Sequence, residues 1–228
     1  VYLDVSKRLP ADEIKRRLPS MWHQFKELAD VDITESPMEV GPTCHYVMGG
    51  VKVDPDTAAA HGVPGLFAAG EVAGGMHGSN RLGGNSLSDL LVFGRRAGAG
   101  AAQYVKSLKD KSPEVSSKEI EKAHEHLNAP FTREGSENPY SLHQELQQVT
   151  QDLVGIIRNE GELKDALKKL ENIRSRAEKV KAVGGRAFNP GFHLAIDLEN
   201  MLMVSEAIAR SALEREESRG GHTRDDYP

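Results

Sequence analysis

The sequence predicts an α/β layer followed by an antiparallel three-helix bundle, because two stretches of the chain differ in character. Residues 41–108 combine short apolar runs, a glycine-rich loop and one long apolar helical pattern, which is typical of an α/β layer. Residues 114–217 carry almost only helical periodicity, and the short connections within them favour neighbours arranged up-down-up. The polar segment at residues 109–113 is the expected boundary between the two stretches.

The first 40 residues predict a short strand followed by a helical stretch. Residues 1–5 read as a strand already under way. This start at Val1 suggests an excised domain or a processed chain, although a missing start would look the same. Apolar side chains between residues 11 and 29 recur every three or four positions, the period of one buried helical face. Pro19 interrupts this period, so we expect a kink or two short helices rather than one straight helix.

Three apolar stripes define the helical region. Gly161 separates the first two stripes, and residues 184–190, which hold a Gly-Gly and an Asn-Pro pair, separate the last two. The tail after them, residues 219–228, is polar and is expected to be extended. The members of the stripes are Leu142, Leu146, Val149, Leu153 and Ile157 in the first; Leu163, Leu167, Leu170, Ile173, Ala177 and Val180 in the second; and Leu194, Leu198, Met201, Val204, Ile208 and Ala212 in the third.

Composition excludes several classes of protein. The formal net charge is −5, which argues against a surface that binds nucleic acid, because such surfaces are basic. No run approaches the about 18 apolar residues that span a membrane, and no signal-peptide pattern is present. Cys44 is the single cysteine, so the chain offers neither an internal disulfide nor a cysteine-rich metal site, which fits a reducing compartment.

A Gly-Glu pair and the glycine-rich loop after it form the most informative stretch. The apolar run at residues 65–71 ends in Gly-Glu. A strand that ends in this way is typical of dinucleotide-binding sheets, where the backbone comes close to a cofactor. The Glu71 carboxylate can accept hydrogen bonds from sugar-like hydroxyls. After the loop, Asn85 or Ser86 is suited to cap a helix that runs to about Val105, and the free N–H groups at such a helix start form an anion site. The same pattern also fits a well-capped structural helix after a flexible loop.

One arginine and one histidine are candidates for binding an anion. Arg81 lies inside the glycine-rich loop, and its planar guanidinium offers a fork of donors matched to a carboxylate. His45 lies near a Gly-Gly turn, which can present its ring into a cleft as a donor toward an anion. From the residues alone, a surface arginine and an ordinary packed or surface histidine remain open alternatives.

Two motifs in this part of the chain resemble the flavoprotein subunit of succinate dehydrogenase and fumarate reductase. Residues 45–50 read HYVMGG, and residues 77–87 read HGSNRLGGNSL, in the order and with the gap typical of that family. The resemblance extends into the helical region, through residues 200–202 (NML) and 217–226 (ESRGGHTRDD). It therefore covers nearly the whole chain.

The resemblance implies roles for particular residues. His45 matches the histidine that holds a substrate carboxylate, and Arg81 matches the arginine that clamps a dicarboxylate, succinate or fumarate. Hydride moves in this family between the substrate carbon and N5 of the flavin of FAD. The residues matched to the flavin site are Glu71, Asn85, Ser86 and Leu87.

The resemblance also assigns the three parts of the chain. Residues 1–40 correspond to the end of a capping domain and the return to the FAD domain, and residues 41–108 to the C-terminal part of the FAD-binding domain. The α/β layer would then be a remnant of an FAD-binding, Rossmann-like domain. Residues 109–228 correspond to the helical C-terminal domain with its polar tail.

Some parts that the family needs are not found in this sequence. No Gly-x-Gly-x-x-Gly fingerprint for the FAD pyrophosphate is present, and the residue that tethers the flavin is also absent. The proton-transfer arginine is expected upstream, so no catalytic residue is assigned within these 228 residues. We therefore expect the isolated chain to retain no FAD and to be inactive.

The family implies partners and a location as well. Its flavoprotein binds an iron–sulfur subunit, which relays electrons to a membrane anchor. We therefore expect this protein to be cytoplasmic and peripheral on the inner face of the cell membrane, with no membrane span of its own.

Two alternatives remain open at this point. A related flavoenzyme, such as L-aspartate oxidase or adenylylsulfate reductase, would share part of the motif, although residues 82–87 and 91–94 favour the succinate and fumarate branch. A non-catalytic helical module that docks on a partner would explain the apolar stripes without any reaction.

Overall fold

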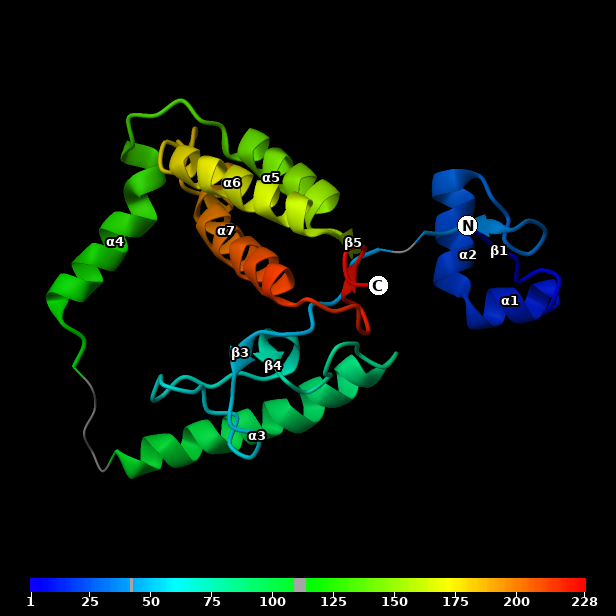
Figure 1. Ribbon diagram of the computed structural model, residues 1–228, viewed down its shortest axis with the longest axis horizontal. Coiled ribbons are helices and arrows are strands. Elements are labelled where there is room, and N and C mark those ends of the chain that lie inside the picture. Colours follow the sequence, from blue (N-terminus) through cyan, green and yellow to red (C-terminus); the bar gives the residue numbers. More distant parts are fainter. Residues whose placement is uncertain (42, 109–113) are drawn as a thin grey trace. The chain divides into compact units, whose positions relative to one another are not determined.

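The computed structural model describes residues 1–41, 43–108 and 114–228, which form two compact units, Val1–His45 and Tyr46–Pro228 (Figure 1). The described chain is mostly helical, with seven α-helices and three sheets of two short strands each. The boundary predicted at residues 109–113 lies outside the described residues.

The first unit holds a small sheet and two helices. Strand β1 (Tyr2–Leu3) pairs antiparallel with β2 (Met38–Glu39). Helix α1 (Ala11–Arg17) ends just before α2 (Pro19–Ala29), whose first residue is the proline that cannot continue the preceding helix. The prediction of two short helices is confirmed.

The glycine-rich part of the second unit contains little regular sheet. Strand β3 (Val51–Lys52) pairs parallel with β4 (Ala73–Gly74), and the long helix α3 (Asn85–Ser107) follows close to the predicted bounds. The strand expected at residues 65–71 is wrong: Phe67 makes an isolated bridge to Ala59, and Gly70–Val72 is a short 3-10 helix, η1. A strand needs neighbouring strands on which to form its ladder, and two residues of β3 supply almost none.

Four further helices follow, and three of them pack around one core. Their bounds are α4 (Ser117–Thr132), α5 (Pro139–Leu153), α6 (Glu160–Ala177) and α7 (Pro190–Glu214). Helices α5, α6 and α7 lie side by side in Figure 1, and their buried side chains form one hydrophobic cluster. None of the described helices combines the length and apolar character needed to cross a membrane.

Asparagine side chains fix where these three helices begin. Asn138 accepts a hydrogen bond from the N–H of Tyr140, Asn159 from that of Glu162, and Asn189 from that of Phe192. Each of these bonds satisfies one of the backbone donors that a helix start leaves unpaired. Residues Asn138 and Asn189 are each followed by proline at the first helical position, where its missing N–H has no cost.

The stripes predicted for the helical region are largely confirmed, with two corrections. Ile157 lies in the short strand β5 (Ile157–Arg158) and is 58% exposed, because α5 ends at Leu153. On α7 the buried face passes through Leu202, whereas Val204 is 55% exposed. Leu202 lies four residues after the fully buried Leu198 and therefore shares its helical face, which Val204, at six residues, does not.

The tail is folded, so the expectation of an extended segment is wrong. Strand β6 (Thr223–Arg224) pairs parallel with β5. The Arg224 side chain is 1% exposed and donates to the carbonyls of Ala212, Leu213 and Arg215, at the end of α7. Arg224 also donates through two nitrogens to the Asp226 carboxylate, at 2.7 Å each, and these bonds hold the pKa of that carboxyl well below its usual range. The unpaired carbonyls at the end of α7 thus bind the cationic Arg224 side chain. The sequence alone shows this part of the tail only as polar.

Candidate functional site

The loop that carries Arg81 lies between β4 and the start of α3. Gly84 is the N-cap of α3, with a left-handed φ of 80°, and no side chain caps this helix. Asn85 and Ser86 are therefore its first two helical residues, and the prediction that one of them is the N-cap is wrong. Glycine takes the N-cap position because the loop turns into the helix through a conformation that other residues adopt at a cost. The backbone donors at this helix start consequently remain without a side-chain acceptor from the described chain.

The half-buried Arg81 side chain is held by an aromatic ring. Its guanidinium carbon lies 4.5 Å from the centroid of the Tyr46 ring, a cation–π distance. Its Nη1 donates to the Leu82 carbonyl at 3.2 Å. Among the described residues, its Nε is a buried donor without a hydrogen-bond partner. Buried donors in native proteins are nearly always paired, so this one indicates an acceptor that is not part of the described chain.

A buried carboxylate, that of Asp89, lies next to Tyr46. Asp89, on α3, has a side chain only 3% exposed, and its Oδ2 is 3.1 Å from Nε2 of His77. The same oxygen accepts the Tyr46 hydroxyl at 3.4 Å. The rings of Tyr46 and His77 meet edge to face, with centroids 5.5 Å apart. None of these three residues is among the predicted site residues, although an aspartate among the leucines at the start of α3 is a usable signal.

Glu71 lies beside the segment that contains Tyr46. Its Oε1 accepts a hydrogen bond from the backbone N–H of Val47 at 3.0 Å, and the side chain is exposed. The two backbones approach closely here, since a Cβ added to Gly50 would lie 2.1 Å from the carbonyl oxygen of Val72. Gly50 of the first motif therefore has a structural reason, which is to allow the β3 and β4 segments to pack.

The predicted site residues divide between the two units. His45 is the last residue of the first unit and is exposed. Arg81, Glu71, Asn85, Ser86 and Leu87 all belong to the second unit. Leu87 is 67% exposed at the start of α3, where an apolar side chain is free to cover a planar ring.

The C-terminal tail contacts the loop of Arg81. The N–H of Gly221 donates to the carbonyl of Ser79 at 2.8 Å, and a Cβ added to Gly220 would lie 2.4 Å from the same oxygen. A cavity of about 370 Å³ beside this contact is lined by Gly78, Ser79, Arg215 and Arg219. Residues 217–226 carry part of the family resemblance, but the docking of the tail on the loop could not be read from the sequence.

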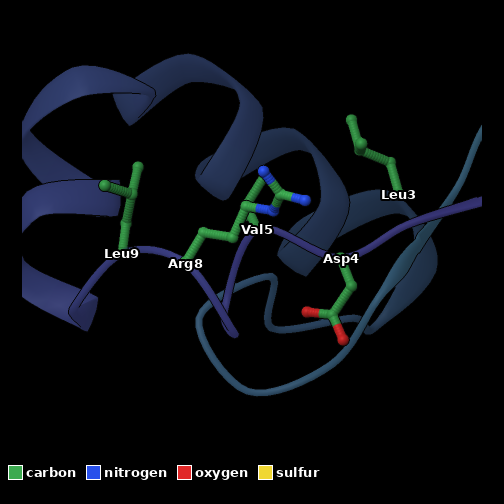
Figure 2. Close-up of a pocket in the computed structure, with 5 residues that line it drawn as sticks. All are labelled: Leu3, Asp4, Val5, Arg8 and Leu9. Carbon is green, nitrogen blue, oxygen red and sulfur yellow. The ribbon is translucent and has the colours of Figure 1, made fainter.

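A second cavity lies within the first unit. Its volume is about 580 Å³, and it is lined by Leu3, Asp4, Val5, Arg8 and Leu9 (Figure 2). Asp4 is engaged by the Ser6 hydroxyl at 2.7 Å and by Lys7 at 3.0 Å, and the hydrogen bond from Ser6 chiefly lowers its pKa. Its carboxylate is thus occupied by neighbours in sequence, and this cavity contains none of the predicted site residues.

Comparisons with known proteins identify relatives of this chain. A family model described as an FAD binding domain matches residues 1–87, and one described as the fumarate reductase flavoprotein C-term matches residues 143–228. One chain of the fumarate reductase (CoM/CoB) of Methanothermobacter marburgensis is 40% identical over 228 residues, which are 100% of the present chain and 40% of that protein. The succinate dehydrogenase flavoprotein subunit of Coxiella burnetii is 38% identical over 225 residues, which cover 94% of the present chain and 38% of that protein.

A solved structure extends the likeness to three dimensions. Mycobacterium smegmatis Sdh1, in complex with UQ1, superposes with a TM-score of 0.87 and 66% identity, over 100% of this chain and 38% of that one. Fold and matches together place the chain among portions of flavoproteins that contain an FAD binding domain. The chain belongs to the succinate dehydrogenase and fumarate reductase flavoprotein family, as its motifs predicted, and it spans about 40% of the length of the curated relatives that it matches.

Proposed function

We propose that the full-length protein interconverts succinate and fumarate with FAD, and that this chain supplies part of the substrate and flavin site. The observation that carries the proposal is the state of Arg81. Its guanidinium is held on an aromatic face and its buried Nε lacks an acceptor among the described residues. A substrate carboxylate is a suitable acceptor, because it matches the planar fork of arginine donors.

We further infer that, in the full-length protein, His45 binds a substrate carboxylate and Arg81 binds the dicarboxylate substrate. Such a ligand carries two negative charges, so a donor or cation is needed for each end. The exposure of His45 leaves its ring available to a ligand. Binding of this kind accelerates a reaction only where the donors hold the transition state more tightly than the substrate, and alignment of the reacting carbon is a large part of the expected gain.

The residues of the second unit fit FAD. The Glu71 carboxylate is exposed and can accept from the flavin's ribityl or sugar hydroxyls beside its bond to Val47. Asn85 and Ser86 lie in the uncapped first turn of α3, where N–H groups suit a negatively charged group, and Leu87 would cover the ring. FAD would supply a hydride acceptor, and these residues would hold and orient it.

Further parts of the proposal concern architecture and partners. We infer that α5, α6 and α7 form an antiparallel three-helix bundle, which their common core supports. Residues 1–40 and 41–108 would be parts of the capping and FAD domains, and residues 109–228 the helical domain. The full-length protein would bind an iron–sulfur subunit and, through it, a membrane anchor on the inner face of the cell membrane.

Arginine variants of the full-length protein test this function. Arg81→Gln should lower succinate turnover, measured with an artificial electron acceptor, by about 10²–10³-fold, as loss of one essential donor does. FAD content, read from the released flavin absorbance, should stay at the wild-type value. The matched control is Arg96→Gln, because Arg96 donates to the Pro55 carbonyl from an exposed face of α3.

The substrate set separates the alternatives. Wild-type protein should act on succinate and fumarate and should leave L-aspartate unchanged. Aspartate oxidation would contradict the proposal in favour of the related oxidase. Unchanged turnover in Arg81→Gln would favour a docking role for the chain.

A further inference from the structure

Tyr46, His77 and Asp89 form a cluster around one buried carboxylate. Burial of a carboxylate is costly unless hydrogen-bond donors compensate it. Asp89 meets this need with two partners, the His77 ring and the Tyr46 hydroxyl, both on a single oxygen, Oδ2. The side chains of Asp89 and His77 are 3% and 6% exposed. The hydrogen bond to Asp89 therefore holds the hydroxyl end of the Tyr46 side chain in place.

The state of Tyr46 suits it to this arrangement. Burial, followed by the charge of Asp89, raises the pKa of its hydroxyl, so the group keeps its proton and donates at neutral pH. The edge-to-face contact with His77 restrains the plane of the ring. The face of that ring is then available to Arg81, whose guanidinium carbon lies 4.5 Å from its centroid.

Support by a ring differs from support by a carboxylate. In the described part of the chain no carboxylate forms an ion pair with Arg81, and its one hydrogen bond is to the Leu82 carbonyl. A carboxylate partner would occupy the fork of arginine donors and compete with an anionic ligand. An aromatic face attracts the cation through its quadrupole and leaves the N–H edges open.

We propose that Asp89 and His77 are positioning residues, which hold the Tyr46 ring as a platform that aims the Arg81 guanidinium at a ligand carboxylate. The inference rests on the proposed function, since it takes Arg81 as the carboxylate-binding group. It assigns Tyr46 to the support of Arg81, and Asp89 and His77 to the support of Tyr46.

Calorimetric titration of the full-length protein with malonate tests the proposal, because malonate is a dicarboxylate with no adjacent carbons from which hydride can leave. Tyr46→Leu removes the ring and should weaken malonate binding about 10-fold, in line with a desolvated cation–π contact. Tyr46→Phe keeps the ring and should weaken binding about 3-fold, and Asp89→Asn should have an effect between these two. FAD content should be unchanged in all three variants.

A matched control removes a different ring from the same unit. Tyr104 lies on α3 and packs against Phe67, with ring centroids 6.2 Å apart. Tyr104→Leu should change thermal stability without changing malonate affinity. Should Asp89→Asn fail to fold, the two Tyr46 variants still decide, because they leave the buried carboxylate in place.

The outcomes distinguish this inference from the proposed function. Unchanged malonate affinity in Arg81→Gln would overturn the proposed function. Loss of binding in Arg81→Gln, together with wild-type affinity in Tyr46→Leu and Asp89→Asn, would overturn only the positioning role. A lowered melting temperature with wild-type affinity would likewise show that the cluster serves the fold alone.

Discussion

The helical core of α5–α7 and the glycine-rich region around α3 use apolar side chains in opposite ways. Fifteen buried residues from α5, α6, α7 and their connections form one cluster, and the leucines among them are at most 3% exposed. Residues 46–108 bury only three hydrophobic residues, Ala58, Ala60 and Ala68, while Leu82 and Leu91 are 77% and 76% exposed. Burial of apolar area is the main source of stability, so the helical core stabilises itself and the α3 region gains little from its own contacts.

The region around α3, residues 46–108, instead holds buried polar groups and closely packed backbone. Its buried polar residue is Asp89, its buried unpaired donor is Arg81 Nε, and its glycines allow close backbone approach. These features cost stability unless a ligand or other surface compensates them. Apolar burial thus stabilises the helical core, whereas the region around α3 carries the groups of the proposed binding site.

Two leucine substitutions test the difference in stability between the helical core and the α3 region, and they carry the largest expected effect. Leu170→Ala, at a site 1% exposed in α6, should lower the free energy of unfolding by about 2–5 kcal/mol, since it leaves a cavity in the core. Leu91→Ala, at a site 76% exposed in α3, should change it by less than about 0.5 kcal/mol. Urea unfolding followed by far-UV circular dichroism measures both. Equal effects would mean that the two regions do not differ in stability.

A glycine substitution tests the contact between the tail and the loop. Gly220 has a φ of +63°, and a Cβ there would meet the Ser79 carbonyl oxygen at 2.4 Å. Gly220→Ala should therefore cost about 1–3 kcal/mol in urea unfolding, from left-handed backbone strain and the clash. Gly185→Ala is the control, because Gly185 has open space around its Cβ position. Similar losses in both variants would argue that the tail does not dock on the loop.

The smallest expected effect concerns pH and the tail. Nδ1 of His222 faces Nη1 of Arg158 at 2.9 Å, and its Nε2 faces the Arg215 carbonyl at 3.1 Å, which fits a neutral ring. Burial, and further the charge of Arg158, lowers the pKa of His222 below the ordinary 6.5. The unfolded chain therefore takes up a proton first, so this contribution to stability is complete above about pH 6.5 and is lost as the pH falls.

Unfolding at pH 7.5 and 5.5 measures this contribution. His222→Gln should reduce the difference in unfolding free energy between the two conditions. His61→Gln, at an exposed histidine, should leave that difference as in the wild type. A pH dependence that is identical in all three proteins would exclude His222 as its source.

The helical core could be predicted from the sequence because its signals are local. Asn-Pro pairs announce two of its helix starts, and apolar residues at steps of three and four mark the buried faces. The prediction for α7 was wrong only at Val204, which is exposed while Leu202 is buried. Which of these neighbouring apolar residues is buried depends on what packs against the helix.

The contacts around the candidate site could be predicted less completely, because they join residues that are distant in sequence. Arg81 could be chosen as a carboxylate donor, but its support by Tyr46 and Asp89 depends on how β3, the loop and α3 come together. The start of α3 shows the same limit, since a glycine took the N-cap position that Asn85 or Ser86 could fill. The N-cap preference of asparagine and serine decides the helix start only where the backbone conformation of the loop allows either residue at that position.

The bond between Gly221 and Ser79 has a consequence for the order of folding. It joins two segments from opposite ends of the second unit, so it closes a long loop of chain, and contacts of that kind form late. The loop of Arg81 would then reach its final form only after α7 and the tail have folded. A partly folded chain would thus form the helical core before it forms the loop of the proposed site.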